Sequence, residues 1–265
     1  MNTKEELLEL VSQLRRRVEQ GHESDFMVSP SRPAAPTHPP TVRAGRLVDK
    51  SGAAEPPPAI SGPPVDALAA LAAKIDACRA CPLGEHRLKA VFGVGSPTAR
   101  VMFIGEGPGY EEDHRGEPFV GKSGQLLDRI LESIGLSRQT VYIANVVKCH
   151  PMKEPDPELR GNDRPPTPEE TAACRGYLDE QIRLIEPRVL VLLGASALKA
   201  LLGPGESITR ARGQWRRYTP DGGTAVKVLP TYHPAALLRD PDLKKDVWTD
   251  MKALRAELEN SAEDA

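Results

Sequence analysis

Four cysteines are the first residues of this 265-residue chain whose number and spacing suggest chemistry. Cys78 and Cys81 form a CxxC pair, which can hold one corner of a metal site, and Cys149 and Cys174 follow at wider spacing. In a reducing compartment, an even set of four cysteines favours a metal or cluster site over disulfides. The spacing alone is equally compatible with an iron–sulfur cluster and with zinc, and buried structural thiols are the plainer alternative.

A glycine-rich segment carries the densest group of polar residues. It reads Gly-Glu-Gly-Pro-Gly-Tyr-Glu-Glu-Asp over residues 105–113 and Gly-Glu-Pro-Phe-Val-Gly-Lys-Ser-Gly over residues 116–124. A nucleotide-binding turn is the obvious competitor, but the glycines do not give the spacing GxGxxG. In addition, Pro108 lacks the amide that a phosphate needs, and the adjacent acidic side chains would repel a pyrophosphate. The segment therefore argues against a dinucleotide site.

The elements that must position these residues can be read from the apolar pattern. Short β-rich runs predict strands at residues 100–105, 141–147, 188–194 and 225–231, and helical patterns occupy residues 66–77, 123–134, 168–185, 195–202 and 242–259. Strands that alternate with helices indicate a parallel sheet covered on both faces. We therefore expect a three-layer α/β/α fold with a central, mainly parallel four-stranded sheet, plus a disordered N-terminal extension.

Three polar residues lie near the ends of these predicted strands. Glu106 follows the first strand, Asn145 lies late in the second, and His233 follows the fourth. In open parallel sheets, ligands bind at the carboxyl ends of the strands. The three side chains are therefore expected on one edge, where they could form a binding site.

The N-terminal quarter of the chain has a different character. Leu7, Val11, Leu14 and Val18 form one apolar stripe, which predicts an amphipathic helix over residues 1–22 that offers a docking face to a protein partner. Residues 23–64 are rich in proline and alanine and predict a flexible linker. The globular domain is expected over residues 65–260, with a tail at 261–265.

Charge and composition narrow the class of protein without naming it. The 35 basic and 37 acidic residues give a net charge of -2, so no bulk positive field indicates nucleic acid. The best local basic cluster contains Arg210, Arg212, Arg216 and Arg217 around Trp215. No apolar run predicts a signal peptide or a membrane span, so we expect a cytoplasmic, monomeric protein.

Three motifs together resemble the family 4, iron–sulfur type uracil-DNA glycosylases. The glycine-rich segment looks like the first motif of that family, His233-Pro234-Ala235-Ala236-Leu237 looks like the second motif of the wider superfamily, and residues 145–149 are similar to the strand that carries an asparagine and a cluster cysteine. The resemblance implies an enzyme that flips uracil out of DNA and hydrolyses its N-glycosidic bond in base excision repair. It also implies a [4Fe–4S] cluster, with zinc the less favoured occupant, on Cys78, Cys81, Cys149 and Cys174.

The resemblance also assigns roles within the pocket. Phe119 would stack on the base beside Gly107, and the amide of Asn145 would read the O4 and N3–H of uracil. His233 would donate to O2 of the departing base, and Glu106 and Glu112 would stabilise the sugar and orient water. The plainer alternatives are a core Phe119, a strand-end Asn145, a structural His233, and glutamates that cap the following turn.

The remaining expectations concern DNA. Leu237 resembles the wedge that fills the hole left by the flipped base, although an ordinary helix leucine is the alternative. Arg210 and Arg212 would grip phosphates, and the lack of a histidine in their segment predicts turnover instead of a trapped adduct. The polar stretch of residues 152–166 is expected to loop outward. The competing function is a non-catalytic iron–sulfur or zinc module that only binds DNA.

Overall fold

The computed structural model describes residues 64–263. The predicted N-terminal helix, residues 23–63 of the predicted linker and the last two residues of the predicted tail lie outside the described residues, as does the disorder expected of the extension. Pro64 and residues 261–263, predicted as linker and tail, are helical. The described chain runs in the order α2 Pro64–Asp76, α3 Leu83–His86, β1 Val94–Gly95, β2 Val101–Gly105, α4 Tyr110–Arg115, α5 Lys122–Ser133, β3 Tyr142–Asn145, α6 Pro168–Ile185, β4 Val189–Leu193, α7 Gly194–Leu202, α8 Ile208–Ala211, β5 Arg216–Tyr218, β6 Val226–Thr231, α9 Pro234–Arg239, η1 Pro241–Leu243 and α10 Lys244–Glu263.

The strands form one six-stranded mixed sheet in the order β1-β3-β2-β4-β6-β5. The inner strands β3, β2, β4 and β6 are parallel, as the sequence predicted, whereas β1 and β5 add antiparallel edges. The expectation of four strands was therefore too low. The edge strands escaped prediction because β1 has only two residues and β5 is a mostly exposed Arg-Arg-Tyr run without an apolar pattern.

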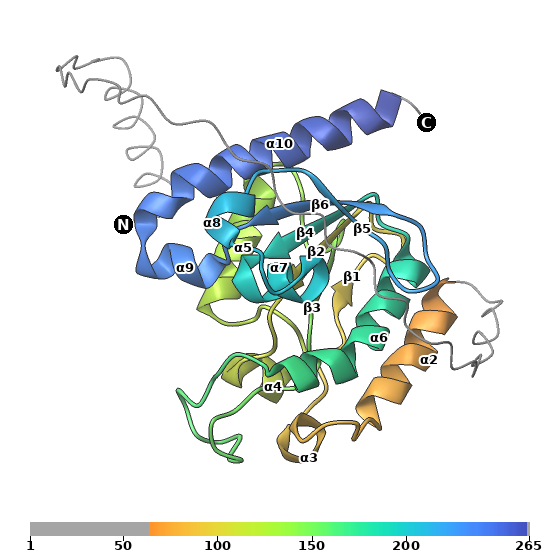
Figure 1. The fold of residues 1–265 in the computed structure, drawn as a ribbon, viewed down its shortest axis with the longest axis vertical. Helices are drawn as coiled ribbons and strands as arrows, with labels where there is room; N and C mark the ends of the chain where they lie inside the picture. The colour runs from red at the N-terminus through yellow and green to blue at the C-terminus, as the bar shows by residue number, and fades with distance from the viewer. Residues whose placement is uncertain (1–63, 264–265) are drawn as a thin grey trace, which may run out of the picture. The chain divides into compact units, whose positions relative to one another are not determined.

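Helices cover both faces of the sheet. Alternate residues of β2 point to opposite sides, so Met102 and Ile104 join one apolar cluster with α6 and α7, while Phe103 joins another with α5, α9 and α10. Figure 1 shows α2 beside α6 and α10 passing β6. The parallel strands are buried on both sides, which explains why their sequences are continuously apolar.

The register of the sheet brings the candidate site residues together. Gly105, the last residue of β2, pairs with Asn145, the last residue of β3. Helix α6 begins at a capping box in which Thr167 and Glu170 satisfy each other's backbone N–H groups, which fixes the helix that carries Cys174. Among the described helices, none is long and apolar enough to cross a membrane.

Candidate active site

A pocket of about 600 Å³ lies at the carboxyl ends of the parallel strands. Its size is typical of a small-molecule site. Six of the residues selected from the sequence line it, namely Glu106, Gly107, Glu112, Phe119, Asn145 and His233. Arg210, Arg212 and Leu237 do not line it. The prediction that Glu106, Asn145 and His233 lie together at the carboxyl ends of the strands is therefore confirmed.

Asn145 lines this pocket and carries a buried polar atom that the protein itself does not use. The residue is 2% exposed, and its Oδ1 has no hydrogen-bond partner among the described residues. A Cβ atom at Gly105 would lie 2.4 Å from this oxygen and 2.6 Å from Cζ of Phe119. Only glycine at position 105 lets the amide and the aromatic ring meet. A buried acceptor left unpaired is costly, so Asn145 suits a ligand that brings a donor.

Phe119 is held in a conformation that a non-glycine residue rarely adopts. Its φ of 55° places it in the left-handed region. Arg138 donates to the carbonyl oxygens of Pro118 and Phe119 and is anchored by Asp128 at 2.6 Å. Gly124 allows the close approach of α5, because a Cβ there would collide with the Phe119 carbonyl. Arg138 carried no recognisable signal in the sequence, because its partners are two backbone oxygens and one carboxylate elsewhere in the chain.

Glu112 holds the same loop from the other side. Its carboxylate accepts hydrogen bonds from the backbone N–H groups of Gly109, Val120 and Gly121 at 3.2, 2.9 and 3.1 Å. The capping alternative is therefore present in the structure. A carboxylate with these donors positions the Phe119 loop, although it also lines the pocket.

His233 is the N-cap of helix α9, and its side chain is neutral at physiological pH. Its Nδ1 accepts a hydrogen bond from the backbone N–H of Ala235 at 3.1 Å, so the proton of the neutral ring is on Nε2. Burial of the ring, with a smaller effect of the Arg239 charge, lowers the pKa of His233 to about 4. The imidazole lies beside Phe119, with ring centroids 5.4 Å apart. The site thus contains an uncharged donor next to an aromatic face.

Glu106 is oriented by a residue that the sequence analysis missed. Ser196, in the first turn of α7, donates from Oγ to Oε2 of Glu106. Ser196 follows the third predicted strand, so the strand-end argument applied to the other three strands would have found it. Next to Glu106, a Cβ at Gly107 would lie 2.8 Å from Cγ2 of Val147. Tight packing therefore explains why no side chain stands beside Glu106.

The DNA-contacting residues inferred from the sequence need correction. Leu237 is 2% exposed and packs in the core with α5 and α10, so it cannot enter DNA without leaving that core. The exposed leucine of this helix is Leu238, at 47%. Arg212 donates to the buried carboxylate of Asp250 at 2.6 Å, so the positive charge of Arg212 is already paired within the protein. Arg210 is exposed and remains available to phosphate.

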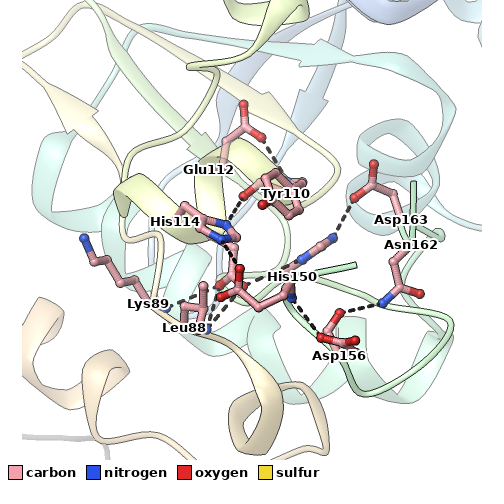
Figure 2. Close-up of polar contacts among 12 residues, drawn as sticks. Leu88, Lys89, Tyr110, Glu112, His114, His150, Asp156, Asn162 and Asp163 are labelled. Atoms are coloured by element: carbon pink, nitrogen blue, oxygen red, sulfur yellow. Dashed lines mark hydrogen bonds and ion pairs between the residues drawn. The ribbon is translucent and has the colours of Figure 1, made fainter. Parts of the chain in front are cut away.

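Residues 152–166 loop outward as expected, because nearly all residues from 153 to 161 are exposed. The ends of the segment return to the body through a bridge between Met152 and Asp163, and Asp163 and Arg164 line the pocket, which the sequence did not indicate. The buried His150 anchors this turn through its Nε2, 2.6 Å from Oδ1 of Asp163 (Figure 2). Burial of His150 lowers its pKa, but the hydrogen bonds and charges of Asp113 and Asp163 outweigh burial and raise the pKa to about 9. A charged pair therefore anchors this wall of the pocket.

The four cysteines line a second cavity together with Arg87 and Lys148. They are free thiols, and Arg87 donates to Sγ of Cys149 over 2.7 Å. Burial raises the pKa of Cys149 to about 11, against the opposing effect of Arg87, and burial also raises the pKa of Cys174. Among the described residues, no group of three histidine, cysteine or acidic side chains is arranged to hold a single metal ion.

Comparison with known proteins agrees with this geometry. The sequence model of the uracil DNA glycosylase superfamily matches residues 92–252. A type-4 uracil-DNA glycosylase of Thermotoga maritima is 43% identical over 186 residues, which are 69% of this chain and 90% of that protein. Type-4 uracil-DNA glycosylases of Sulfurisphaera tokodaii and Archaeoglobus fulgidus are 40% and 42% identical, over 72% and 68% of this chain and 84% and 88% of their own lengths.

The fold, the pocket and the family match define the class: this chain belongs to the uracil DNA glycosylase superfamily. Within the superfamily, the identity and coverage of the matched relatives place it in the type-4 family.

Proposed function

We propose that this protein is a uracil-DNA glycosylase, which extrudes uracil from DNA and hydrolyses its N-glycosidic bond to leave an abasic site during base excision repair. The observation that carries the proposal is the buried, unpaired Oδ1 of Asn145, a residue that lines one pocket together with Phe119 and the neutral His233. The amide of Asn145 matches the hydrogen-bonding edge of a flipped uracil, and the ring of Phe119 matches its plane. The uncharged donor of His233 matches the oxygen O2 of the departing base.

Recognition rests on Asn145. Its Oδ1 accepts the N3–H of uracil, and its Nδ2 donates to O4. Cytosine reverses this pattern, because its N3 has no hydrogen and its N4 is an amine. Cytosine would therefore leave the buried oxygen of Asn145 unpaired and bring an amine against the donor, which excludes it from the pocket.

Bond cleavage places negative charge on the departing base, and His233 meets that charge. Because Nδ1 accepts the hydrogen bond from Ala235, Nε2 carries the proton and donates to O2 of uracil. This donor stabilises the uracil anion more than the bound substrate, which lowers the barrier. The imidazole stays neutral, so it acts by hydrogen bonding and does not transfer its proton.

The sugar becomes positively charged as the bond breaks, and Glu106 is the carboxylate placed to act on it. Ser196 fixes one carboxylate oxygen of Glu106, whereas Glu112 is engaged with three backbone N–H groups. We therefore propose that Glu106 orients the attacking water and that Glu112 positions the Phe119 loop. Gly107 adds no competing base beside Glu106.

A [4Fe–4S] cluster is the occupant that we infer for the cavity of Cys78, Cys81, Cys149 and Cys174. The thiols line one cavity, and Arg87 supplies positive charge to what would be a negative group. A single zinc ion on the four cysteines is the less favoured occupant. When bound, the cluster would cross-link the loop before α3, the segment after β3 and helix α6.

Contacts with DNA outside the pocket involve exposed side chains near its rim. Arg239 lines the pocket and is exposed, Leu238 is its neighbour, and Arg210 lies on α8, whose Ile208 also lines the pocket. We assign phosphate contact to Arg210 and Arg239 and the wedge to Leu238. A cytoplasmic, monomeric state and a partner for the N-terminal segment stay predictions.

The test is release of free uracil from DNA that carries one uracil labelled in the base, measured by chromatography. Release of the base, with cytosine-containing DNA of the same sequence left intact, is the expected result. DNA binding without release from the cluster-loaded protein would favour the non-catalytic binding module.

A further inference from the structure

Lys148 is a fully buried lysine to which the proposed reaction assigns no role. Its exposure is 0%, and its Nζ donates a hydrogen bond to the backbone carbonyl of Asn145 over 2.6 Å. Asn145 lines the pocket, and its buried Oδ1 has no hydrogen-bond partner among the described residues. Lys148 therefore contacts the backbone of the residue proposed to read uracil.

The same lysine borders the cysteine cavity. It precedes Cys149 in the chain, it lines the cavity, and its backbone N–H donates to Sγ of Cys174 at 3.4 Å. One residue thus contacts both the proposed metal site and the proposed recognition residue. Val146 and Val147, which separate Lys148 from Asn145, are each 1% exposed, so the connecting segment is packed on both sides.

The charges around this cavity are unbalanced in the protein alone. Arg87 and Lys148 line it, and no carboxylate is among the described residues that do so. A buried ammonium without a counter-charge is strongly unfavourable. Four thiolates around an iron–sulfur cluster carry a net negative charge, which is the counter-charge that these cations require.

We propose that Lys148 is a positioning residue that couples the cysteine site to uracil recognition: negative charge on the loaded site holds the ammonium, and the ammonium holds the Asn145 carbonyl. The inference rests on the proposed function, because it assigns the coupling to the recognition residue of that function. Lysine suits the position because a flexible stem with a compact charge can reach a carbonyl on one side while it faces thiolates on the other.

The experiment compares cluster-loaded wild type with Lys148→Met and Lys148→Arg, and with Lys199→Met as a matched control at an exposed position of α7. Iron content, the midpoint potential of the cluster and the Kd of free uracil are measured for each protein. Lys148→Met should bind uracil roughly tenfold more weakly, because a charged hydrogen bond to the Asn145 carbonyl is lost. Its potential should become more negative, because a buried positive charge has been removed.

Lys148→Arg keeps the charge and so tests the proposal even if Lys148→Met fails to retain iron. Its potential should stay near that of wild type, while its bulkier planar group shifts Asn145 and still weakens uracil binding. Equal uracil affinity in wild type and both Lys148 variants, or an unchanged potential in Lys148→Met, would overturn the coupling. Failure of wild type to bind or release uracil would instead count against the proposed function.

Discussion

The backbone N–H of Ala235 donates a hydrogen bond to Nδ1 of His233 over 3.1 Å, and this contact determines which nitrogen of the imidazole carries its proton. The same bond makes His233 the N-cap of helix α9. Because protonation of Nδ1 would break the cap, the low pKa of about 4 and the structure of the helix start support each other.

The first prediction is that base excision is insensitive to pH through the ordinary histidine range. His233 titrates near 6.5 in an unfolded chain and near 4 when folded, so the imidazole stays neutral until the pH approaches about 4. A rate profile of kcat/KM from pH 8 to 4.5 checks this. A fall in rate centred near pH 6.5 that Asn substitution of His233 removes would contradict a neutral donor.

The same pKa has a consequence for stability. Between about pH 6.5 and 4 the unfolded chain takes up a proton at His233 that the folded chain does not, so acidification through this range lowers the free energy of unfolding. The contribution is on the order of 3 kcal/mol and is fully present above pH 6.5. Urea unfolding of wild type and His233→Gln at pH 7 and 4.5 should show a steeper loss in wild type.

The second prediction concerns the unpaired oxygen of Asn145. Substitution by Ala should reduce kcat/KM for uracil excision by about 100-fold, because the contacts to N3–H and O4 are lost. The free energy of unfolding should stay within about 1 kcal/mol of wild type, because the change also removes a buried acceptor without a partner. Base-release rates and urea unfolding measure the two effects. Near-normal excision by Asn145→Ala would refute the role in recognition.

The third prediction is that Gly105→Ala inactivates the pocket. The added methyl group would collide with Asn145 Oδ1 and the Phe119 ring, which must move apart. We expect a loss of at least tenfold in uracil affinity, measured as the Kd of free uracil. Gly176→Ala is the control, because a Cβ at that helical position meets nothing within 4 Å. Equal affinity in both variants would show that the two side chains need not meet.

The fourth prediction separates neighbouring leucines on α9. Leu237→Ala should lower the free energy of unfolding by about 2–5 kcal/mol, because the residue is in the core. Leu238→Ala should change it by less than about 0.5 kcal/mol and should slow excision from duplex DNA more than from single strands. Equal rates on both substrates for Leu238→Ala would exclude it as the wedge.

The fifth prediction uses salt dependence to distinguish the arginines. Arg210→Ala should weaken DNA binding and reduce the slope of log K against log salt concentration by about 0.9, as expected for one lost phosphate contact. Arg212→Ala should instead destabilise the fold, because it leaves the buried Asp250 unpaired, with the salt slope unchanged at temperatures where it stays folded. A changed slope in Arg212→Ala would restore its predicted role at the DNA.

The apolar pattern of the sequence predicted the centre of the fold well. The parallel strands and α6 were predictable because a strand buried on both faces, such as Val189–Leu193, leaves a continuous apolar run, and because Thr167, Pro168 and Glu170 are strong helix-start signals. The antiparallel edges were not predictable, because an edge strand needs only one partner and little apolar surface.

The errors within the site have a common physical origin. Leu237 and Leu238 are adjacent leucines, and only the packing of α9 decides which one is buried. Arg212 looked like Arg210 until Asp250, 38 residues later in the chain, was found beside it. Residues 152–166 are polar and proline-rich and loop outward, but His150 brings Asp163 back to the wall of the pocket. Each outcome depends on a contact that the local sequence does not contain.

The claim that this pocket excises uracil is tested most directly by an assay on end-labelled DNA that carries one uracil. The quantity measured is the rate at which the cluster-loaded protein creates alkali-labile sites. Wild type, Asn145→Ala, His233→Ala and the control Lys199→Ala should be compared in one assay. A strand break at the uracil that the first two substitutions reduce at least 100-fold, and that Lys199→Ala does not change, is the predicted result. No break from wild type, or equal breaks from all four proteins, would contradict the account of the pocket.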